Sequence, residues 1–406
     1  MTGSMYAAIA GLKTHMNKMN VIGNNIANVN TNGYKSQRTV FKDAMYTMYT
    51  SGSDGNETTG GRNPSQIGYG SQVSSIDLNM ATGTYTPGRA TDCMIYGDGF
   101  FLVGDKEIAN SIDPLDPTSL KSLTLTRVGD FEIKADGYLC DGSGNTVYGF
   151  LTYDTDPETG APKVSDQLVP IRLPKMETVY KNQQNQEITK EAYDGLSPEE
   201  KEKCTVARVP RYPVVRAEGD GETAAVPLRD YTPETEDGEE PVELPFAQMD
   251  SISVNPSTGA ITGTMKDSEQ VITIGYLAIG NVTNPNGVTH TEGFYYKCAE
   301  GAGDLQVSLL GGAGEELGID HVNGSLFASA KEAYQGEEEL GDEPSEKLKI
   351  GSAGGTNLMV GGLEGSNVDL ASEISEMITT QRGYQANTRI ITVTDQMLEE
   401  LVNMKR

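Results

Sequence analysis

Tryptophan is absent from this 406-residue chain, and large apolar residues are scarce throughout it. Hydrophobic residues make up 36% of the chain and aromatic residues 7%, whereas glycine occurs 47 times. A compact α/β enzyme needs a richer core, so the composition favours a β-rich, turn-rich protein with small cores. The length predicts about two to four domains rather than one.

Basic residues are also few. Lysine and arginine number 31 against 58 aspartates and glutamates, which gives a formal net charge of −27. Such an acidic surface argues against nucleic acid and anionic membranes as partners, although solubility alone would account for it. No stretch approaches the roughly 18 apolar residues of a membrane span. We therefore expect no nucleic-acid partner and no membrane insertion.

Cysteine and histidine are too sparse to suggest a metal or redox centre. The four cysteines are Cys93, Cys140, Cys204 and Cys298. They form neither a C-x-x-C pair nor a cluster with any of the three histidines, so we expect neither a zinc site nor a disulfide framework.

The known catalytic motifs are missing as well. The sequence contains no nucleophile elbow, no phosphate-binding loop and no H-E-x-x-H zinc motif. Residues 154–160 faintly resemble the start of a calcium loop, but Ser165 stands where the twelfth-position glutamate belongs. We expect no enzymatic activity, no catalytic residue, no cofactor and no metal.

A secretory signal is also lacking, because Lys13, His15 and Lys18 interrupt any apolar run near the N-terminus. We expect a protein that is cytoplasmic or exported without a cleaved signal peptide.

Two apolar stripes with alternating steps of four and three lie at opposite ends of the chain. The first is Met5, Ile9, Leu12, Met16, Met19 and Ile26; the last is Leu370, Ile374, Met377, Gln381, Tyr384, Thr388, Ile391, Asp395, Leu398 and Val402. This spacing is typical of coiled coils and predicts helices over about residues 4–28 and 366–405. Such helices can pair with each other or with copies of themselves, and core helices of a globular domain are the alternative.

These stripes supply the predicted subunit-assembly residues. They are Ile9, Leu12, Met16, Met19, Ile26, Leu370, Ile374, Met377, Tyr384, Ile391, Leu398 and Val402.

The middle of the chain reads as β-structure. Short β-type runs begin near Val73 and are separated by turn signals such as 97–99 (GDG) and 135–137 (ADG). Asp-Gly between apolar runs is a strong hairpin signal. The fold class expected is mostly β with helical termini that pair as a coiled coil, around a discontinuous β-domain that carries a second, inserted β-domain.

The expected domain boundaries follow composition. Residues 1–30 and 366–406 form the helical domain, 31–72 a connector, 73–150 and 247–365 the inner β-domain, and 151–246 the outer inserted β-domain. The insertion is rich in proline and charge, and residues 218–243 hold ten acids and one base. Disorder is the alternative for such a segment.

Several runs, taken in order, resemble the bacterial flagellar rod and hook axial protein family. They are residues 23–35 (GNNIANVNTNGYK), 97–101 (GDGFF), 126–131 (TRVGDF), 278–287 (AIGNVTNPNG), 365–370 (GSNVDL) and 377–387 (MITTQRGYQAN). They cover both ends and much of the middle of the chain. Within the family, the inserted residues 151–246 favour the hook branch over the shorter distal rod branch.

The resemblance implies a structural subunit that polymerises into a curved, flexible tube and transmits motor torque to the filament. It implies partners among the other axial proteins, namely distal rod, hook cap and hook–filament junction proteins, together with the flagellar type III export apparatus. The expected location is the extracellular hook at the basal body. We also expect the terminal helices to be disordered in the free monomer and to order on assembly.

Two other interpretations stay open on the sequence. A distal rod subunit would form a straight rod rather than a curved tube. A secreted adhesin or enzyme, a different class of protein, would use the helices only as a stalk and would fold them as a monomer.

Overall fold

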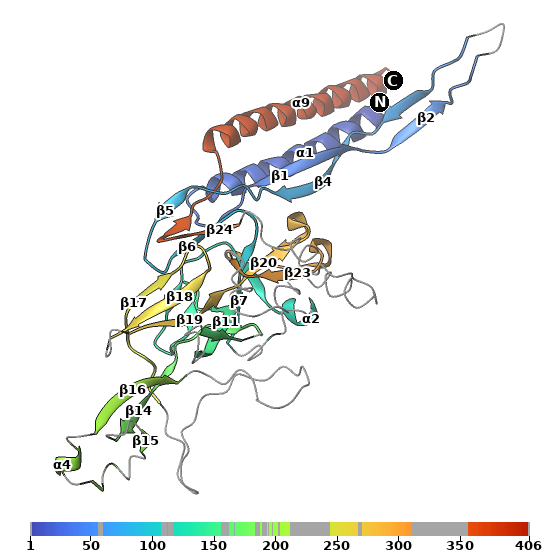
Figure 1. Cartoon of the computed structure of the whole chain (residues 1–406). Helices are drawn as coiled ribbons and strands as arrows, with labels where there is room; N and C mark the ends of the chain where they lie inside the picture. The colour runs from blue at the N-terminus through green and yellow to red at the C-terminus, as the bar shows by residue number, and fades with distance from the viewer. Residues whose placement is uncertain are drawn as a thin grey trace. The chain divides into compact units, whose positions relative to one another are not determined.

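The computed structural model divides into two compact units, which are residues 1–84 with 365–406 and residues 85–364. It describes residues 2–55, 60–106, 112, 117–155, 162–165, 167–182, 187–188, 193, 195–196, 198–201, 204–211, 244–266, 270–310 and 356–404. The structure is mostly β, and the two terminal helices pack together, as expected (Figure 1).

The first unit consists of two long helices and a β-ribbon. Helix α1 spans Thr2–Ala27 and α9 spans Leu370–Asn403. The helices run antiparallel, so the two chain ends lie together (Figure 1). The predicted helix limits are confirmed within a few residues.

Both helices have the expected end signals. The Asn-rich run closes α1 through backbone turns, and Gly33 adopts a φ of 69°, which side chains other than glycine and asparagine disfavour. Asp369 caps α9, since its carboxylate accepts a hydrogen bond from the Ala371 N–H at 3.1 Å.

The segment predicted as a connector forms an antiparallel ribbon instead. Strand β1 (Gln37–Asp43) pairs with β4 (Ser71–Leu78), and β2 (Tyr46–Thr50) pairs with β3 (Ser65–Gly68). The glycine- and serine-rich composition of residues 51–71 hid β3 and the start of β4. Residues 73–84, predicted as the start of the inner β-domain, therefore belong to the first unit.

The second unit is built on an antiparallel sheet of 14 described strands, whose spatial order differs from their order in the sequence. Its main path is β17 (Met249–Val254), β18 (Ala260–Met265), β19 (Val271–Leu277), β11 (Thr146–Thr155), β7 (Phe100–Gly104), β8 (Thr124–Thr126), β22 (Tyr295–Lys297) and β21 (Thr289–His290). Off this path lie β9 (Glu132–Ile133), β10 (Leu139–Cys140), β12 (Pro162–Val164), β13 (Val169–Pro170), β20 (Ile279–Val282) and β23 (Leu305–Ser308).

Smaller elements complete the unit. They are the strand pairs β5 (Tyr85–Pro87) with β25 (Gly362–Glu364) and β6 (Cys93–Tyr96) with β24 (Asn357–Val360), the short helices α2 (Pro117–Leu120) and α4 (Pro198–Lys201), and the 3₁₀ turns η1 (Pro285–Gly287) and η2 (Glu300–Ala302).

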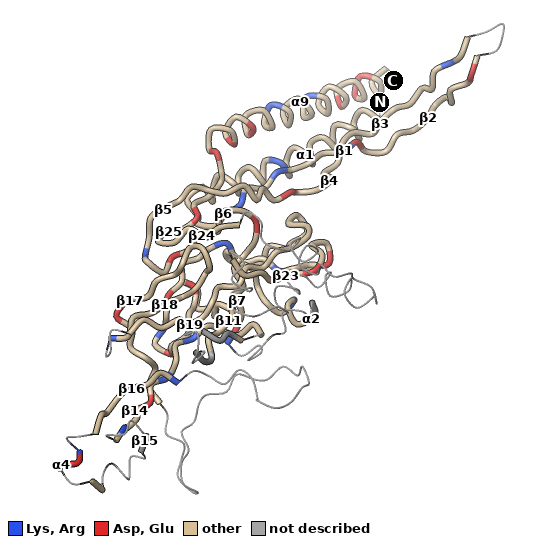
Figure 2. Tube along the Cα trace, viewed as in Figure 1, with Lys and Arg blue, Asp and Glu red and all other residues tan. Residues whose placement is uncertain are grey.

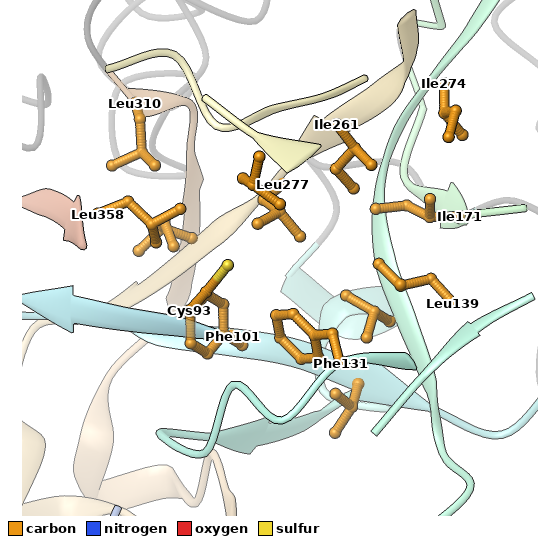
Figure 3. Packing of buried hydrophobic residues seen from close by; sticks show 14 of the residues in the cluster. Cys93, Phe101, Phe131, Leu139, Ile171, Ile261, Ile274, Leu277, Leu310 and Leu358 are labelled. Atoms are coloured by element: carbon orange, nitrogen blue, oxygen red, sulfur yellow. The ribbon is translucent and has the colours of Figure 1, made fainter. Parts of the chain in front are cut away.

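The main apolar cluster packs against the sheet. Phe101 and Phe131 stack edge to face at its centre, with ring centroids 4.9 Å apart (Figure 3). The glycines of the predicted Asp-Gly turns adopt positive φ, 119° at Gly99 and 76° at Gly137. The turn at Gly137 closes the predicted hairpin between β9 and β10, whereas the turn at Gly99 joins β6 and β7, which pair with other strands.

The predicted limits of the insertion differ from the structure. Strand β11 runs through residue 150, and β12 and β13 pair with it. Leu168, Val169 and Ile171 are buried, and the last two belong to the main cluster. The composition of this stretch, rich in proline and charge, concealed these core residues. A separate sheet begins only at β14 (Lys175–Lys181), which pairs with β15 (Glu187–Ile188) and β16 (Thr205–Arg211). Residues 218–243 lie outside the described residues.

Candidate assembly surface

The seam between α1 and α9 is made of small and polar side chains. Gly11 faces Asn387, His15 faces Gly383, and Asn25 faces Glu373. Numbers rise along one helix as they fall along the other, which is the register of an antiparallel pair. Lys18 and Glu376 add an ion pair at 3.0 Å, half open to water and therefore worth at most about 1 kcal/mol.

Close approach explains the two glycines. A Cβ added at Gly11 would lie 2.6 Å from the Asn387 amide nitrogen, and one at Gly383 would lie 2.8 Å from the His15 ring. Glycine costs about 1 kcal/mol within a helix relative to alanine, so its use here reflects the packing.

Asn25 joins both helices to the ribbon. Its Oδ1 accepts hydrogen bonds from the Tyr34 hydroxyl and the Gln37 N–H, both at 3.0 Å. Its Nδ2 donates to the Gln37 carbonyl and to Glu373 Oε1, both at 2.9 Å. The side chain is 1% exposed. All the polar atoms of the Asn25 amide are hydrogen-bonded, and an unpaired buried amide would be costly. This network therefore fixes the end of the helix pair at which α1 ends and α9 begins.

The seam perturbs the ionisable groups within it. Burial raises the pKa of Glu373, opposed by the Asn25 hydrogen bond, and Glu373 Oε2 is buried without a partner. Burial, with the nearby Glu373 charge, raises the pKa of Tyr34 to about 12. Burial and the charge of Lys18 lower the pKa of His15. We therefore expect the stability of the helix pair to depend on pH through Glu373 and His15.

The structure places the predicted assembly residues beside the seam. Half-buried are Ile9, Leu12, Met19, Ile26, Met377, Ile391 and Leu398; exposed are Met16, Leu370, Ile374, Tyr384 and Val402. None of the twelve is fully buried, and all of them lie on the helix pair. Their role in assembly stays a prediction.

Both stripes miss the true seam by one residue at alternate positions. The residues of α9 that face α1 are Glu373, Thr380, Asn387 and Thr394. The stripe residues that follow them by one position, Ile374, Gln381, Thr388 and Asp395, are exposed. In α1 the seam uses Gly11 and Asn25 rather than Leu12 and Ile26. Close backbone approach and hydrogen bonds therefore occupy the intramolecular seam, and the residues of the two stripes lie beside it.

Large apolar side chains are consequently left on the outside of the first unit. On α9 these include Ile374, Ile378, Ile390, Val393, Met397 and Leu401. On the ribbon they are Met45, Tyr46, Met48, Tyr49 and Ile67. Strand β2 carries no charge, and Figure 2 shows long uncharged stretches along the ribbon. An exposed apolar surface of this kind marks an interaction site.

Both ends of the first unit match known family models. Residues 5–35 match the model described as flagella basal body rod protein, and residues 359–404 match that described as flagellar basal body rod FlgEFG protein C-terminal. These segments are α1 with its exit turn and α9 with the strands before it. Both ends of the chain thus resemble the flagellar hook and rod protein family.

Relatives in this family align over the whole chain. The flagellar basal-body rod protein FlgG of Bacillus subtilis is 26% identical over 408 residues, and all of both chains is covered. The flagellar hook protein FlgE of Borreliella burgdorferi is 28% identical over 461 residues, again with both chains covered fully. The FlgE of Salmonella typhimurium is 26% identical over 447 residues, covering 99% of this chain and all of the relative.

Among the described residues, no group of three or more histidine, cysteine or acidic side chains is placed to bind a metal ion. All four cysteines are free thiols, and burial raises the pKa of Cys93 to about 12. None of the described helices has both the length and the apolarity needed to cross a membrane.

Proposed function

We propose that this chain is the structural subunit of a bacterial flagellar hook. The full-length likeness to hook proteins supports this, together with a helix pair that leaves its apolar side chains outside. The observation that carries the proposal is the polar seam between α1 and α9. A seam of Gly11, Asn25, Glu373 and Asn387 leaves the apolar residues free to bind neighbouring copies.

In this role the subunits polymerise into a curved tube outside the cell. The subunit leaves through the flagellar type III export apparatus without cleavage of a signal peptide. It joins the distal rod at one end, and the cap and junction proteins at the other. It transmits torque mechanically, and no catalytic step is involved.

The distal rod is the second candidate, since a rod protein also aligns over the whole chain. The sheet of β14, β15 and β16 stands apart from the main sheet and favours the hook, because an added outer layer suits contacts that slide as the tube bends. Polar interfaces break and re-form more readily than dry apolar ones.

Deleting the chain tests the proposal. A strain without it is expected to make basal bodies that contain the rod and stop before the hook. Purified chain is expected to form curved tubes in electron micrographs. Basal bodies that stop within the rod, or straight polymers, would assign the distal rod instead.

A further inference from the structure

Two groups of exposed apolar residues on α9 and its C-cap residue lie on opposite sides of the helix, in different halves. Leu370, Ile374 and Ile378 form one patch, the N-flank. Ile390, Val393, Met397 and Met404 form the other, the C-flank. All seven side chains are more than a third exposed, from 42% at Leu370 to 82% at Met404.

Helical geometry separates the two patches. At about 100° per residue, Ile374 and Ile378 are rotated by roughly +100° and +140° from the seam residue Glu373. Ile390 and Val393 are rotated by roughly −60° and −120° from the seam residue Asn387. The two patches therefore point to opposite sides of the plane that contains α1 and α9.

Each side is more polar in the half where the other is apolar. The N-flank side continues into the second half of the helix with Gln381, Thr388 and Asp395, and its exposed apolar residues there, Tyr384 and Val402, stand 18 positions apart. The C-flank side carries Ser372, Glu376 and Thr379 in the first half. A polar row between them, Ser375, Arg382, Arg389 and Gln396, stays exposed. The seam side is already occupied by α1.

A second copy of this chain is the occupant that fits both patches. Identical subunits packed side by side with parallel helices present opposite flanks to each other, as in any head-to-tail interface. The N-flank of one subunit then faces the opposite side of the neighbour's α9, and the C-flank is the apolar patch on that side. One copy supplies both patches in equal number.

We propose that α9 of one subunit packs parallel to α9 of the next, N-flank against C-flank, with the helices displaced along their axes. Ile374 is separated from Val393 and Met397 by about 19–23 residues, which at 1.5 Å per residue gives a stagger of roughly 30 Å. An unstaggered contact would place Ile374 against the polar Ser372 and Glu376. The proposal rests on the polymerisation proposed above and specifies its register.

Cysteine pairs in the polymer test this register. In a Cys204→Ser background, the double variant Ile374→Cys/Met397→Cys is expected to give a ladder of covalent oligomers on mild oxidation, since each subunit links to two neighbours. The matched variant Ile374→Cys/Ser372→Cys is expected to give none. The other cysteines, Cys93, Cys140 and Cys298, are buried.

Three outcomes would overturn the stagger. A ladder from the Ser372 pair would show an unstaggered contact, and dimers from Ile374→Cys alone would show antiparallel helices. Polymers that appear normal in electron micrographs but give no ladder from the Met397 pair would reject this contact and leave the hook function standing. Failure of the unmodified chain to polymerise would reject the function as well.

Charge substitutions give a second test that needs no cross-link. Ile374→Asp is expected to raise the critical concentration for polymerisation about tenfold or more, because it removes a buried apolar contact. Gln381→Asp, one heptad later on the same side, is expected to change it less than about twofold. On the other side, Met397→Asp and Thr379→Asp are expected to behave in the same contrasting way. Equal changes in the critical concentration within either pair would contradict the packing of the N-flank against the C-flank.

Discussion

The His15 ring occupies the space that a Cβ would need at Gly383, 2.8 Å from its Nε2 and Cε1. Phe41 of the ribbon meets the same ring edge on, with ring centroids 6.2 Å apart. His15 is thus held between α9 and β1, and its buried Nδ1 makes no hydrogen bond. One side chain sets the spacing of three elements of the first unit.

This contact predicts a coupling between the two residues. Gly383→Ala in the unmodified chain is expected to lower the melting temperature of the polymer, because the new methyl group meets the ring. In a His15→Ala background the same change is expected to stabilise by up to about 1 kcal/mol, the helix propensity gained. Melting followed by circular dichroism gives the coupling energy. Equal effects in both backgrounds would contradict the packing.

Glu373 predicts a pH dependence with a defined sign. Its pKa is raised in the folded state, so its contribution to stability is present below its unfolded pKa and is lost as pH rises through the folded value. Glu373→Gln removes the buried negative charge and is expected to raise the melting temperature of the polymer at pH 7–8. The gain should shrink as the pH falls toward that of the unfolded carboxyl.

His15 acts in the opposite direction and needs its own control. Its pKa is lowered, so the unfolded chain takes up a proton first on acidification and stability falls as the pH drops below its ordinary value. His15→Gln should remove that loss while leaving the Glu373 effect intact. An unchanged pH profile in both variants would contradict both assignments.

The terminal helices were predictable from their stripes and caps, but their contact face was not. Periodicity finds the apolar side of a helix, and in α9 that side is split between two flanks. The seam follows from hydrogen bonds and close backbone approach between residues far apart in sequence, such as Asn25 with Glu373. Those contacts leave no periodic signal in either helix.

The ribbon and the limits of the insertion were not predictable from the sequence for a related reason. Strand β2 is exposed on both faces, so it lacks the alternation of a half-buried strand. Val169 and Ile171 join the main core from a proline-rich stretch, because strand pairing with β11 decides their burial. Composition marks the outer sheet only after Pro174.

A buried ion pair in the second unit predicts a large loss on single substitution. Arg127 donates from Nε to Glu364 at 3.1 Å and from its other nitrogens to the carbonyls of Gly99 and Gly97 at 2.6 and 2.9 Å. Both charged side chains are fully buried, and burial lowers the pKa of Arg127. Glu364→Leu is expected to destabilise by about 3–5 kcal/mol, because the guanidinium loses its counter-ion.

The double variant Arg127→Met/Glu364→Leu is the matched control. It removes both charges and is expected to recover much of the loss, since no unpaired buried ion remains. Urea unfolding of the full chain, followed by far-UV circular dichroism because tryptophan is absent, measures both. A double variant as unstable as the single one would assign the cost to packing rather than charge.

The polar seam predicts that assembly, rather than the monomer, orders the terminal helices. The pair buries little apolar surface of its own, and its stripes are half-buried or exposed until a neighbour covers them. In dilute monomer, amides of residues 2–27 and 370–403 are expected to exchange quickly, whereas the buried strands β7 and β11 stay protected. In the polymer, both helices should become protected to the level of those strands. Full protection of the two helices in dilute monomer would instead mean that the seam is sufficient alone, and that the bare flanks of α9 add binding without folding.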